Sequence, residues 1–224
     1  MCAILGWSNH KEDLLENMNL FKEMLELMKY RGYDSKGYYF ENHTLLGHNR
    51  LSIIDLENGK QPMYYENLII IYNGELYNTN EIKEDLLKKG YDFDTTCDTE
   101  VLLKGYHCYK EKILEKIEGI FAFAIYDQKE KSIFLARDRF GIKPLYYTLK
   151  NNNFLFSSSI KSILKSKVIR PILSKKELEE LLALGPSRKQ GHGVFKDIKQ
   201  LRPAHYMIYK KGNIKIKRYW NLKT

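Results

Sequence analysis

The sequence predicts an α+β fold in which sheets pack face to face and helices are grouped between runs of strands. Many short apolar runs are separated by Gly, Asn and Pro, which is typical of strands joined by turns. The amphipathic helical stretches do not alternate regularly with these runs, which favours a sheet sandwich over a parallel βαβ sheet. The 224 residues, 43% hydrophobic and 29% charged, are enough to bury a sizeable core.

The first half of the chain is expected to begin with a short apolar strand at residues 3–7. An amphipathic helix follows, because apolar residues recur every three or four positions at Leu14, Met18, Phe21, Leu25 and Met28. Strand-like runs then lie at residues 37–40, 44–48, 51–54 and 68–72. Thr79 or Asn80 is expected to cap a helix that stops at Gly90, and a further helix covers about residues 99–109.

The second half is expected to continue the sheets. Strands are predicted at residues 120–127, 131–136 and 154–157, the first with small residues on one face. A helix is predicted at residues 159–164, and Ser174 with Glu177 matches a capping box at the start of another. Residues 205–209 and 214–219 flank Lys-Lys-Gly-Asn and predict a hairpin.

Charge is distributed unevenly along the chain, whose formal net charge is +9. Residues 161–224 carry 17 Lys and Arg against 4 Asp and Glu, a net charge of +13, whereas residues 1–160 carry −4. Such a basic end is compatible with nucleic acid, an anionic membrane or an acidic protein partner, and equally with a lysine-rich solvated surface. No helix-turn-helix, RNP-type or zinc-finger signature supports nucleic-acid binding.

Targeting and redox features favour the cytosol. The longest apolar run, residues 120–126, is too short to span a membrane, and the N-terminus lacks the pattern of a secretory signal. Three cysteines cannot form a closed disulfide framework, so a reducing compartment is expected. Dinucleotide and P-loop signatures are absent, and the spacing of Cys97, His107 and Cys108 matches no common zinc pattern, so no metal is expected.

Cys2 is the most suggestive single residue. Its small side chain permits removal of Met1, which would leave a cysteine that carries its own α-amine. The thiol and the amine have ordinary pKa values of about 8.5 and about 7.7–8.0, so the amine can accept the thiol proton without a histidine partner. The alternative is that Cys2 is a small buried hydrophobic residue.

Further segments, in order behind Met-Cys, extend this observation over essentially the whole chain. They are residues 31–37 (Arg-Gly-Tyr-Asp-Ser-Lys-Gly), 48–55 (His-Asn-Arg-Leu-Ser-Ile-Ile-Asp), 59–62 (Gly-Lys-Gln-Pro), 72–78 (Tyr-Asn-Gly-Glu-Leu-Tyr-Asn), 97–100 (Cys-Asp-Thr-Glu), 119–127 and 137–147 (Arg-Asp-Arg-Phe-Gly-Ile-Lys-Pro-Leu-Tyr-Tyr). Together they resemble the class II glutamine amidotransferases, and most of all the N-terminal glutaminase domain of glutamine-hydrolysing asparagine synthetases.

The resemblance implies a fold and a reaction. The fold is the four-layer αββα sandwich of N-terminal nucleophile hydrolases. The reaction is attack of Cys2 on the side-chain amide of L-glutamine, release of ammonia and hydrolysis of a γ-glutamyl thioester. Asn73 and Gly74 would form the oxyanion hole, where each donor contributes about 2.7–4 kcal/mol to the transition state. Cys2, Asn73 and Gly74 are thus the expected catalytic residues.

The resemblance also implies how glutamine is held. Arg50 would bind the α-carboxylate with its planar fork, and Asp98, with Glu75 beside it, would pair with the α-ammonium. The remaining residues expected along the glutamine site are Leu51, Ser52, Ile53 and Ile54.

Each assignment has a plain structural alternative. Asn73-Gly74 is a common type I′ hairpin turn, and Arg50 suits a surface salt bridge. Asp98 suits a helix N-cap, and Glu75 suits a solvated turn.

Two positions depart from the family pattern. Tyr33 replaces the usual proline of an Arg-Gly-Pro-Asp turn, and Ser159 stands where Glu is usual. We expect the glutaminase domain to cover residues 1–210, with a terminal strand and the start of a linker at 211–224. No Ser-Gly-Gly-x-Asp-Ser pyrophosphate loop occurs, so no cofactor is expected in this chain. ATP and Mg would belong to a synthetase domain or partner, which the basic C-terminal third could dock.

Three functions remain open at this stage. The first is the glutaminase half of an asparagine synthetase, a cytoplasmic ligase of asparagine biosynthesis. The second is a class II amidotransferase that serves another ammonia acceptor. The third is a catalytically idle module that regulates a synthetase. Oligomeric state is left open, and neither nucleic acid nor a membrane is an expected partner.

Overall fold

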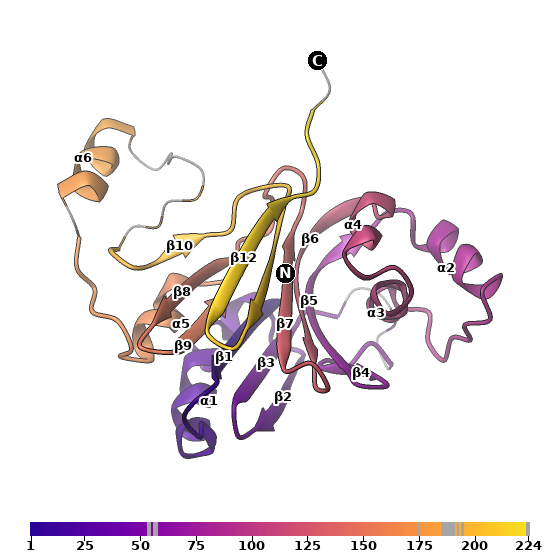
Figure 1. The fold of residues 1–224 in the computed structure, drawn as a ribbon, viewed down its shortest axis with the longest axis horizontal. Coiled ribbons are helices and arrows are strands. Elements are labelled where there is room, and N and C mark those ends of the chain that lie inside the picture. Colours follow the sequence, from indigo (N-terminus) through magenta and orange to yellow (C-terminus); the bar gives the residue numbers. More distant parts are fainter. Residues whose placement is uncertain are drawn as a thin grey trace.

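Two six-stranded antiparallel sheets pack face to face, and helices cover both outer faces (Figure 1). The computed structural model describes residues 1–52, 55, 58–173, 175–184, 191, 193 and 195–222. The layers therefore run helix, sheet, sheet, helix, which confirms the αββα sandwich expected from the resemblance.

The first strand of the chain, β1 (Ala3–Asn9), lies near the middle of the first sheet. The order of this sheet is β10 (Lys199–Gln200), β8 (Tyr146–Lys150), β9 (Asn153–Ser157), β1, β3 (Thr44–Arg50) and β2 (Ser35–Glu41). Ala3 lies opposite Asn49 on β3, and Leu5 lies opposite Ser157 on β9. Because β1 is flanked on both sides, the start of the chain is fixed within the sheet.

The second sheet is built around long antiparallel neighbours. Its order is β12 (Asn213–Arg218), β11 (His205–Lys210), β7 (Ser132–Arg137), β6 (Gly119–Asp127), β5 (Leu68–Leu76) and β4 (Met63–Tyr65). β5 and β6 pair along nine positions, from Leu68 opposite Asp127 to Leu76 opposite Gly119. This pairing holds the C-terminal half of β5 rigidly, and the pocket described below borders it.

Helices form the outer layers. α1 (Met18–Glu26) and α5 (Ile160–Lys165) pack on the first sheet, and α2 (Thr79–Leu87), α3 (Asp98–Tyr109) and α4 (Ile113–Lys116) pack on the second. α6 (Lys175–Leu184) stands apart in Figure 1. Single 3-10 turns cover Leu15–Asn17, Lys29–Arg31 and Lys110–Lys112. Within the described residues, no helix has the length and apolarity that crossing a membrane requires.

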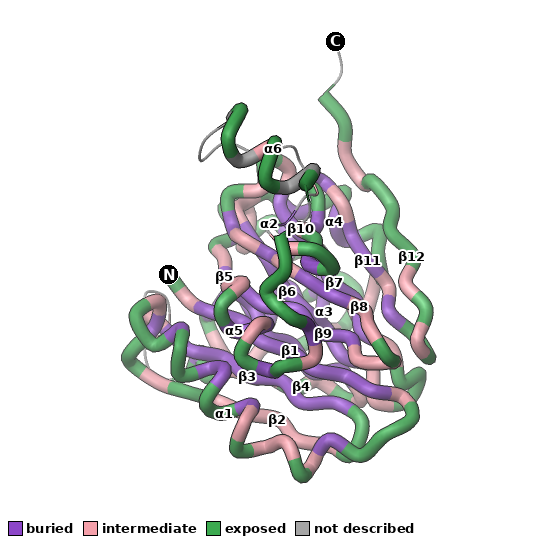
Figure 2. Tube along the Cα trace, turned by 90° about the vertical axis from the view of Figure 1, so that its left-hand side faces the viewer, coloured by how far each residue is buried: buried purple, intermediate pink, exposed green. Residues whose placement is uncertain are grey.

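Burial is concentrated in the central strands, which are purple in Figure 2, whereas α6 and β12 are mostly green. One apolar cluster fills the space between the sheets, and two others join each sheet to its helices. Ala122 and Ala124 of β6 face the space between the sheets, whereas Phe121 and Phe123 face the helices. This confirms the prediction of small residues on one face, and it lets the two sheets approach closely.

Most predicted elements are confirmed, with shifted ends. The expected strand at 51–54 is wrong for Leu51 and Ser52, which lie in a loop after β3, and its other two residues, Ile53 and Ile54, lie outside the described residues. The residue before α2 is Asn78 rather than Thr79 or Asn80, and Ser174 of the expected capping box also lies outside the described residues. β4, β8 and β10 were not predicted.

His48 joins the two sheets through the core. It is fully buried on β3, and its Nε2–H donates to the carbonyl oxygen of Tyr72 on β5 at 3.0 Å. Burial, with a smaller contribution from the charge of Arg50, lowers the pKa of His48 to about 4. The folded protein thus holds this histidine neutral, whereas the unfolded chain protonates it near its ordinary pKa of about 6.5.

We therefore expect stability that is full above pH 6.5 and decreases as the pH falls toward 4. The linked loss is about 2–3 kcal/mol of unfolding free energy between pH 7.5 and pH 4.5. Urea unfolding across this range measures it. His48→Gln should flatten the dependence, whereas His43→Gln, at an exposed histidine, should not. An unchanged slope in His48→Gln would contradict the assignment.

Arg137 and Asp138 form a clamp after β7. The Arg137 guanidinium donates to the carbonyl oxygens of Lys143, Leu201 and Gly141 at 2.6–2.7 Å. Asp138 is buried, and its carboxylate accepts backbone N–H groups at 3.0–3.3 Å. These donors are Phe121, Phe140, Ile142 and Lys143. Residue 143 is consequently held at both its N–H and its carbonyl.

The clamp predicts that Asp138→Asn destabilises the fold although it keeps the shape of the side chain. Each carboxylate oxygen accepts two N–H groups, so in either orientation the amide NH₂ faces two donors. We expect a loss of about 2–4 kcal/mol in the free energy of unfolding. Urea titration measures it, with Asp13→Asn as control, because exposed Asp13 accepts only the Leu15 N–H. Equal midpoints for the two variants would contradict the clamp.

Candidate active site

A pocket of about 630 Å³, open to solvent, lies where the beginning of β1 meets the C-terminal half of β5. Its walls come from segments far apart in the sequence. They are Met1, Cys2, Arg50, Leu51, Gly59, Gln61, Tyr72, Gly74, Glu75, Cys97, Asp98, Thr99 and Lys143.

Cys2 borders this pocket directly before the first residue of β1. Its thiol lies against the loop after β3, where the Leu51 N–H is 3.4 Å from Sγ and the Leu51 carbonyl oxygen is 3.6 Å away. Arg31 Nε donates to the Cys2 carbonyl oxygen at 3.2 Å. Met1 is 56% exposed at the pocket, so the N-terminal residue can leave without disturbing the core.

Opposing influences act on the Cys2 thiol. Burial raises its pKa, while the Leu51 N–H, the N-terminal ammonium, Arg50 and Lys143 lower it. Burial also lowers the pKa of the N-terminal amine of Met1, and Lys143 and Arg31 lower it further. Burial thus favours the neutral form of both the thiol and the amine, and one proton transfer between two such groups gives a thiolate and an ammonium.

Asn73 and Gly74 lie inside β5, opposite Ala122 and Phe121 of β6. The hairpin-turn alternative for Asn-Gly is therefore wrong. Gly74 lines the pocket, and a Cβ there would lie 2.5 Å from the Ile120 carbonyl oxygen. A residue with a side chain does not fit here without a shift of the backbone, so no side chain covers the backbone of β5 at Gly74.

The Asn73 side chain faces the space between the sheets, because it alternates with Tyr72, which faces the helices. Cys2 lies on the same inner side, since it alternates with Ala3 and precedes the inward-facing Ile4. Asn73 is 1% exposed, and its Nδ2 has no hydrogen-bond partner within the described residues. It is not part of the pocket lining, so its amide is a buried donor behind the wall.

Asp98 is the first residue of α3 and is buried in the pocket wall. Its Oδ2 accepts the Tyr72 hydroxyl at 2.9 Å and the Leu76 N–H at 3.1 Å. The N-cap alternative for Asp98 is wrong, because Cys97 occupies that position. Burial raises the pKa of Asp98 against these two donors. A cation would be the natural counter-charge for such a carboxylate.

Arg50 closes another part of the wall. It is only 6% exposed, which excludes the surface-salt-bridge alternative. Its Nη2 donates to the Asp55 carbonyl oxygen at 2.6 Å. Gly59 packs directly on the guanidinium, since a Cβ at Gly59 would lie 2.3 Å from Nη2. The positions of Arg50 and Asp98 give the pocket one cationic and one anionic wall.

The other predicted residues divide into three groups. Glu75 is exposed and lines the pocket, but in a strand rather than a turn. Leu51 lines the pocket, and Ser52 donates its N–H to Asp34 without lining it. Ile53 and Ile54 lie outside the described residues.

The two departures from the family pattern lie away from the pocket lining. Tyr33 is 70% exposed in its turn, and Ser159 directly precedes α5, with its N–H bonded to Ser157 Oγ. Neither side chain touches the pocket.

The prediction from sequence missed several wall residues. Lys143 is 8% exposed, and its backbone is fixed by the Arg137–Asp138 clamp. Gln61 joins two walls, because its Oε1 accepts the Tyr72 N–H at 2.6 Å and its Nε2 donates to Thr99 at 3.3 Å. Both lie in quoted motif segments, and a lysine between Ile142 and Pro144, five residues after Asp138, was the available signal.

No group of three or more His, Cys, Asp or Glu side chains within the described ranges is arranged to hold a metal ion. His107 contacts Tyr91 at 2.8 Å and Glu66 at 3.2 Å on the outer face of α3. The three cysteines are free thiols.

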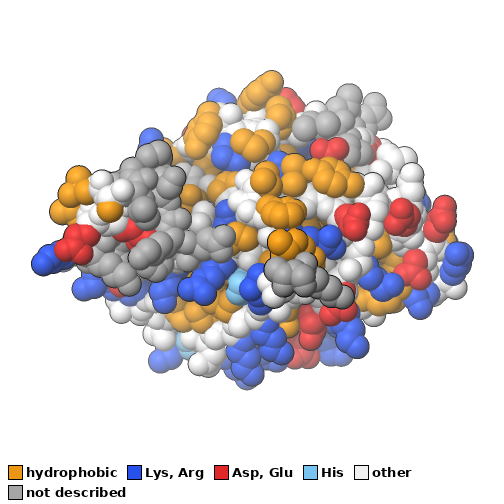
Figure 3. All heavy atoms as spheres, turned by 90° about the horizontal axis from the view of Figure 1, so that it is seen from above, with side chains coloured by type: hydrophobic (Ala, Val, Ile, Leu, Met, Phe, Trp, Pro, Cys, Tyr) orange, Lys and Arg blue, Asp and Glu red, His pale blue; other side chains and the backbone are white. Residues whose placement is uncertain are grey.

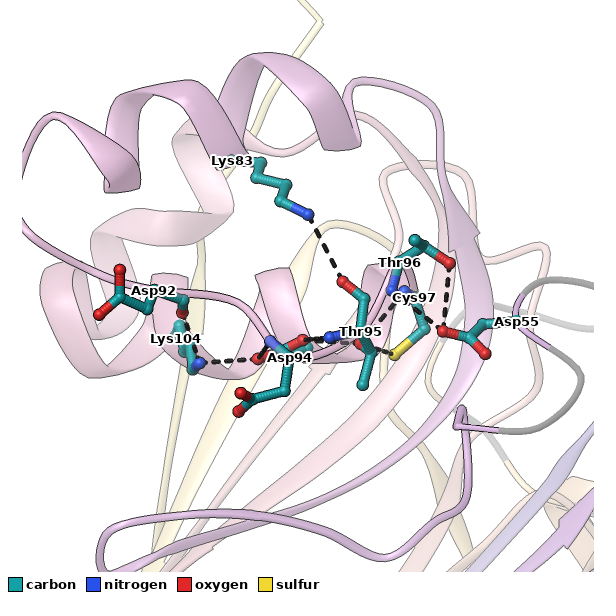
Figure 4. Close-up of polar contacts among 9 residues, drawn as sticks. Asp55, Lys83, Asp92, Asp94, Thr95, Thr96, Cys97 and Lys104 are labelled. Atoms are coloured by element: carbon teal, nitrogen blue, oxygen red, sulfur yellow. Dashed lines mark hydrogen bonds and ion pairs between the residues drawn. The ribbon is translucent and has the colours of Figure 1, made fainter.

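The loop before Asp98 is held by a polar network (Figure 4). Glu100 on α3 accepts the N–H groups of Asp94 and Thr95 and pairs with Lys104 at 2.6 Å, both charges being buried. Thr96 in turn donates to Asp55 at 3.0 and 3.1 Å. This network fixes the backbone from which Asp98 enters the pocket.

Two packed antiparallel sheets between helical layers, with a cysteine at the start of a central strand, define the N-terminal nucleophile hydrolase type of fold. Solved structures support this class. A glutamine phosphoribosylpyrophosphate amidotransferase from Bacillus subtilis superposes with a TM-score of 0.69 at 17% identity, over 98% of this chain and 49% of that one. An allosteric regulatory enzyme of purine biosynthesis superposes with a TM-score of 0.71 at the same identity and coverage.

The sequence places the chain within this class. The family described as "Glutamine amidotransferase domain" matches residues 1–220, and the chain belongs to it. "Asparagine synthetase [glutamine-hydrolyzing] 3" of Bacillus subtilis is 42% identical over 228 residues, covering 100% of this chain and 37% of that protein. "Asparagine synthetase B [glutamine-hydrolyzing]" of Escherichia coli is 35% identical over 161 residues, covering 71% and 29%. The chain therefore spans about a third of the length of these relatives.

The charge of Lys143 yields a testable prediction about the thiol. Lys143→Met removes a positive charge that lowers the pKa of Cys2. Alkylation of Cys2 by iodoacetamide should then require higher pH, and its rate at pH 7 should fall by about threefold to tenfold. Lys143→Arg should restore the rate, and Lys60→Met, at an exposed lysine outside the pocket lining, should leave it unchanged. Equal pH profiles for Lys143→Met and the parent chain would contradict this role.

Proposed function

We propose that this chain hydrolyses the side-chain amide of L-glutamine to glutamate and ammonia. One observation carries the proposal: Cys2, the cationic Arg50 and the anionic Asp98 border the same pocket beside the N-terminus. An α-amino acid needs both charged walls, and its side chain needs a nucleophile at a distance from them. The names of two relatives describe them as glutamine-hydrolysing, which agrees with this chemistry.

Recognition of glutamine would follow from the wall charges. Arg50 binds the α-carboxylate through its planar fork, and Asp98, with Glu75 nearby, binds the α-ammonium. Tyr72 holds the Asp98 carboxylate in place. Burial and the neighbouring Asp98 raise the pKa of the Tyr72 hydroxyl, so Tyr72 stays a hydrogen-bond donor.

The chemistry would proceed by acyl transfer after removal of Met1. The α-amine of Cys2 accepts the thiol proton, and the sulfur attacks the amide carbon of glutamine. The Asn73 amide and the Gly74 N–H stabilise the oxyanion, and the Asn73 Nδ2 is suited to this because it is buried without a partner in the described structure. The ammonium returns its proton as the C–N bond breaks and ammonia leaves. Water then hydrolyses the thioester to glutamate.

We further propose that the ammonia serves an ATP-dependent synthetase domain or subunit that converts aspartate to asparagine. The asparagine synthetase relatives support this acceptor. ATP and Mg would bind there, so this chain needs no cofactor for its own step. Figure 3 shows apolar side chains around the centre of the face seen from above. Phe140 and Ile142, which lie in the same loop as Lys143, are 71% and 57% exposed. This face suits a docking partner, and the free cysteines fit the cytosol.

A different ammonia acceptor is the second candidate. One relative, 34% identical over 237 residues, is called "Amidase chry2" in Gibberella zeae, so relatives of this similarity do not all have the same name. A partner with a phosphosugar-binding domain would favour this candidate. Retention of Met1 would favour the catalytically idle regulatory module instead.

The first test is the intact mass before and after treatment with a glutamine-like diazoketone that alkylates nucleophilic cysteine. We expect loss of Met1 and one adduct on Cys2 that excess glutamine prevents. Cys2→Ala should abolish the adduct and lower glutaminase activity about a thousandfold or more. Cys108→Ala, outside the pocket lining, should retain both.

Retained Met1, or a processed chain with no adduct and no turnover, would overturn the proposal. Adding a synthetase domain in trans then decides between the idle module and a domain that requires its partner. Asparagine formation in that mixture, with glutamine as nitrogen donor, identifies the acceptor.

A further inference from the structure

Arg50 and Asp98 have opposite charges, and they must keep a fixed separation if they are to bind the two charged groups of one amino acid. Arg50 ends β3 in the first sheet, whereas Asp98 begins α3 on the outer face of the second sheet. The backbone ladders of the sheets do not join these two segments. Another contact must therefore set the distance between the two ends of the substrate.

Asp55 makes contacts toward both segments. On one side, its carbonyl oxygen accepts Arg50 Nη2 at 2.6 Å and the Gly59 N–H at 3.1 Å. On the other side, its carboxylate Oδ2 accepts the N–H of Thr96 at 3.0 Å and the Thr96 hydroxyl at 3.1 Å. One residue thus contacts the Arg50 guanidinium and the segment that leads into Asp98.

The Asp98 side of this link is rigid. Thr96 follows Thr95, whose N–H and hydroxyl donate to the buried Glu100 at 2.8 and 2.6 Å. Glu100 is in turn paired with the buried Lys104. Figure 4 shows Thr96 directed toward Asp55 at one end of this chain of contacts.

The Asp55 side is shaped for the same contact. Asp55 has a φ of 47°, in the left-handed region that non-glycine residues seldom adopt. Its Oδ1 accepts the Asn58 N–H at 2.9 Å, which holds the carboxylate in a local turn. The Thr96 and Asn58 N–H groups together keep the pKa of Asp55 below its ordinary range, so the carboxylate is ionised at neutral pH and accepts all three donors.

We propose that Asp55 is a positioning residue for amino-acid recognition, which ties Arg50 to the Asp98 segment through Thr96 and so sets the span between the sites for the α-carboxylate and the α-ammonium. This inference rests on the proposed glutaminase function. Asp55 acts through Arg50 and Thr96, and it is not part of the pocket lining. Its removal should weaken recognition of the amino-acid end and leave the thiol chemistry intact.

Two alkylating reagents separate these effects. Iodoacetamide has no amino-acid group, so its reaction with the Cys2 thiol does not depend on Arg50 and Asp98. The glutamine-like diazoketone, in contrast, must be held by its α-carboxylate and α-ammonium. For Asp55→Ala we expect alkylation by the diazoketone to slow about tenfold or more, with the rate of iodoacetamide within about twofold of the parent chain. The KM for glutamine should rise by a similar factor, with kcat changed far less.

Further variants isolate the contact. Thr96→Val removes one of the two donors to Oδ2 and should show a smaller effect in the same direction. The double variant should be no worse than Asp55→Ala alone, because both changes break one link. Asp94→Ala is the matched control, since this exposed aspartate lies in the same loop and Figure 4 shows its carboxylate directed away from the network. Asp94→Ala should match the parent chain.

The outcomes are distinct. If the parent chain hydrolyses glutamine and Asp55→Ala has the same KM, the inference is wrong while the proposed function stands. If Asp55→Ala slows both reagents equally, Asp55 acts on the nucleophile or the fold, and the inference is again overturned. If the parent chain itself neither hydrolyses glutamine nor reacts with the diazoketone, the proposed function fails first. Should Asp55→Ala not fold, Thr96→Val gives the same comparison.

Discussion

The pairing of β1 with β3 is the constraint on which the site depends. It places the first residues of the chain beside the last residues of β3, so Cys2 lies at Leu51 and next to Arg50. Because β1 is also paired with β9, its start cannot swing away from the second sheet. A free chain end is normally the most mobile part of a domain. Here the residue after Met1 is held by contacts of its thiol with Leu51 and of its carbonyl oxygen with Arg31, and the nucleophile that we propose depends on such a fixed position.

The pocket joins parts of the fold that are stabilised separately. Glu100 and Lys104 hold the segment before Asp98, and the Arg137–Asp138 clamp holds Lys143. His48 joins the two sheets behind the pocket through Tyr72, whose hydroxyl also orients Asp98. Asp98 and Lys143 are therefore each supported by buried contacts, which is how a site keeps its geometry before substrate binds.

The sequence was sufficient for most elements of the fold, and its failures have physical reasons. The pattern of apolar residues located α1, which buries one face, and β5 and β6, which are buried on both faces. It failed for β4 and β10, which have three and two residues and are too short to show a period. It also failed at Leu51, an apolar residue that lies in a loop rather than a strand.

The site residues depended on the resemblance more than on local pattern. Asn73-Gly74 has the composition of a turn. Only the pairing of β5 with β6 over nine positions, which include these two residues, shows that they lie in a strand. Lys143 and Asp55 were within the quoted segments but had no assigned role, because their importance lies in contacts with residues far away in the sequence. Local patterns carry no information about such partners.

The buried amide of Asn73 lowers the stability of the folded protein without substrate. A buried donor without a partner destabilises a protein by about 1–3 kcal/mol, and Asn73 is such a donor within the described part of the chain. An apolar side chain of similar volume would suit this position between the sheets better. Selection for thermal stability alone would therefore tend to remove Asn73. Under the proposed function, in which Asn73 stabilises the oxyanion, selection for turnover would retain it, and stability and catalysis would favour different amino acids at this one position of a core strand.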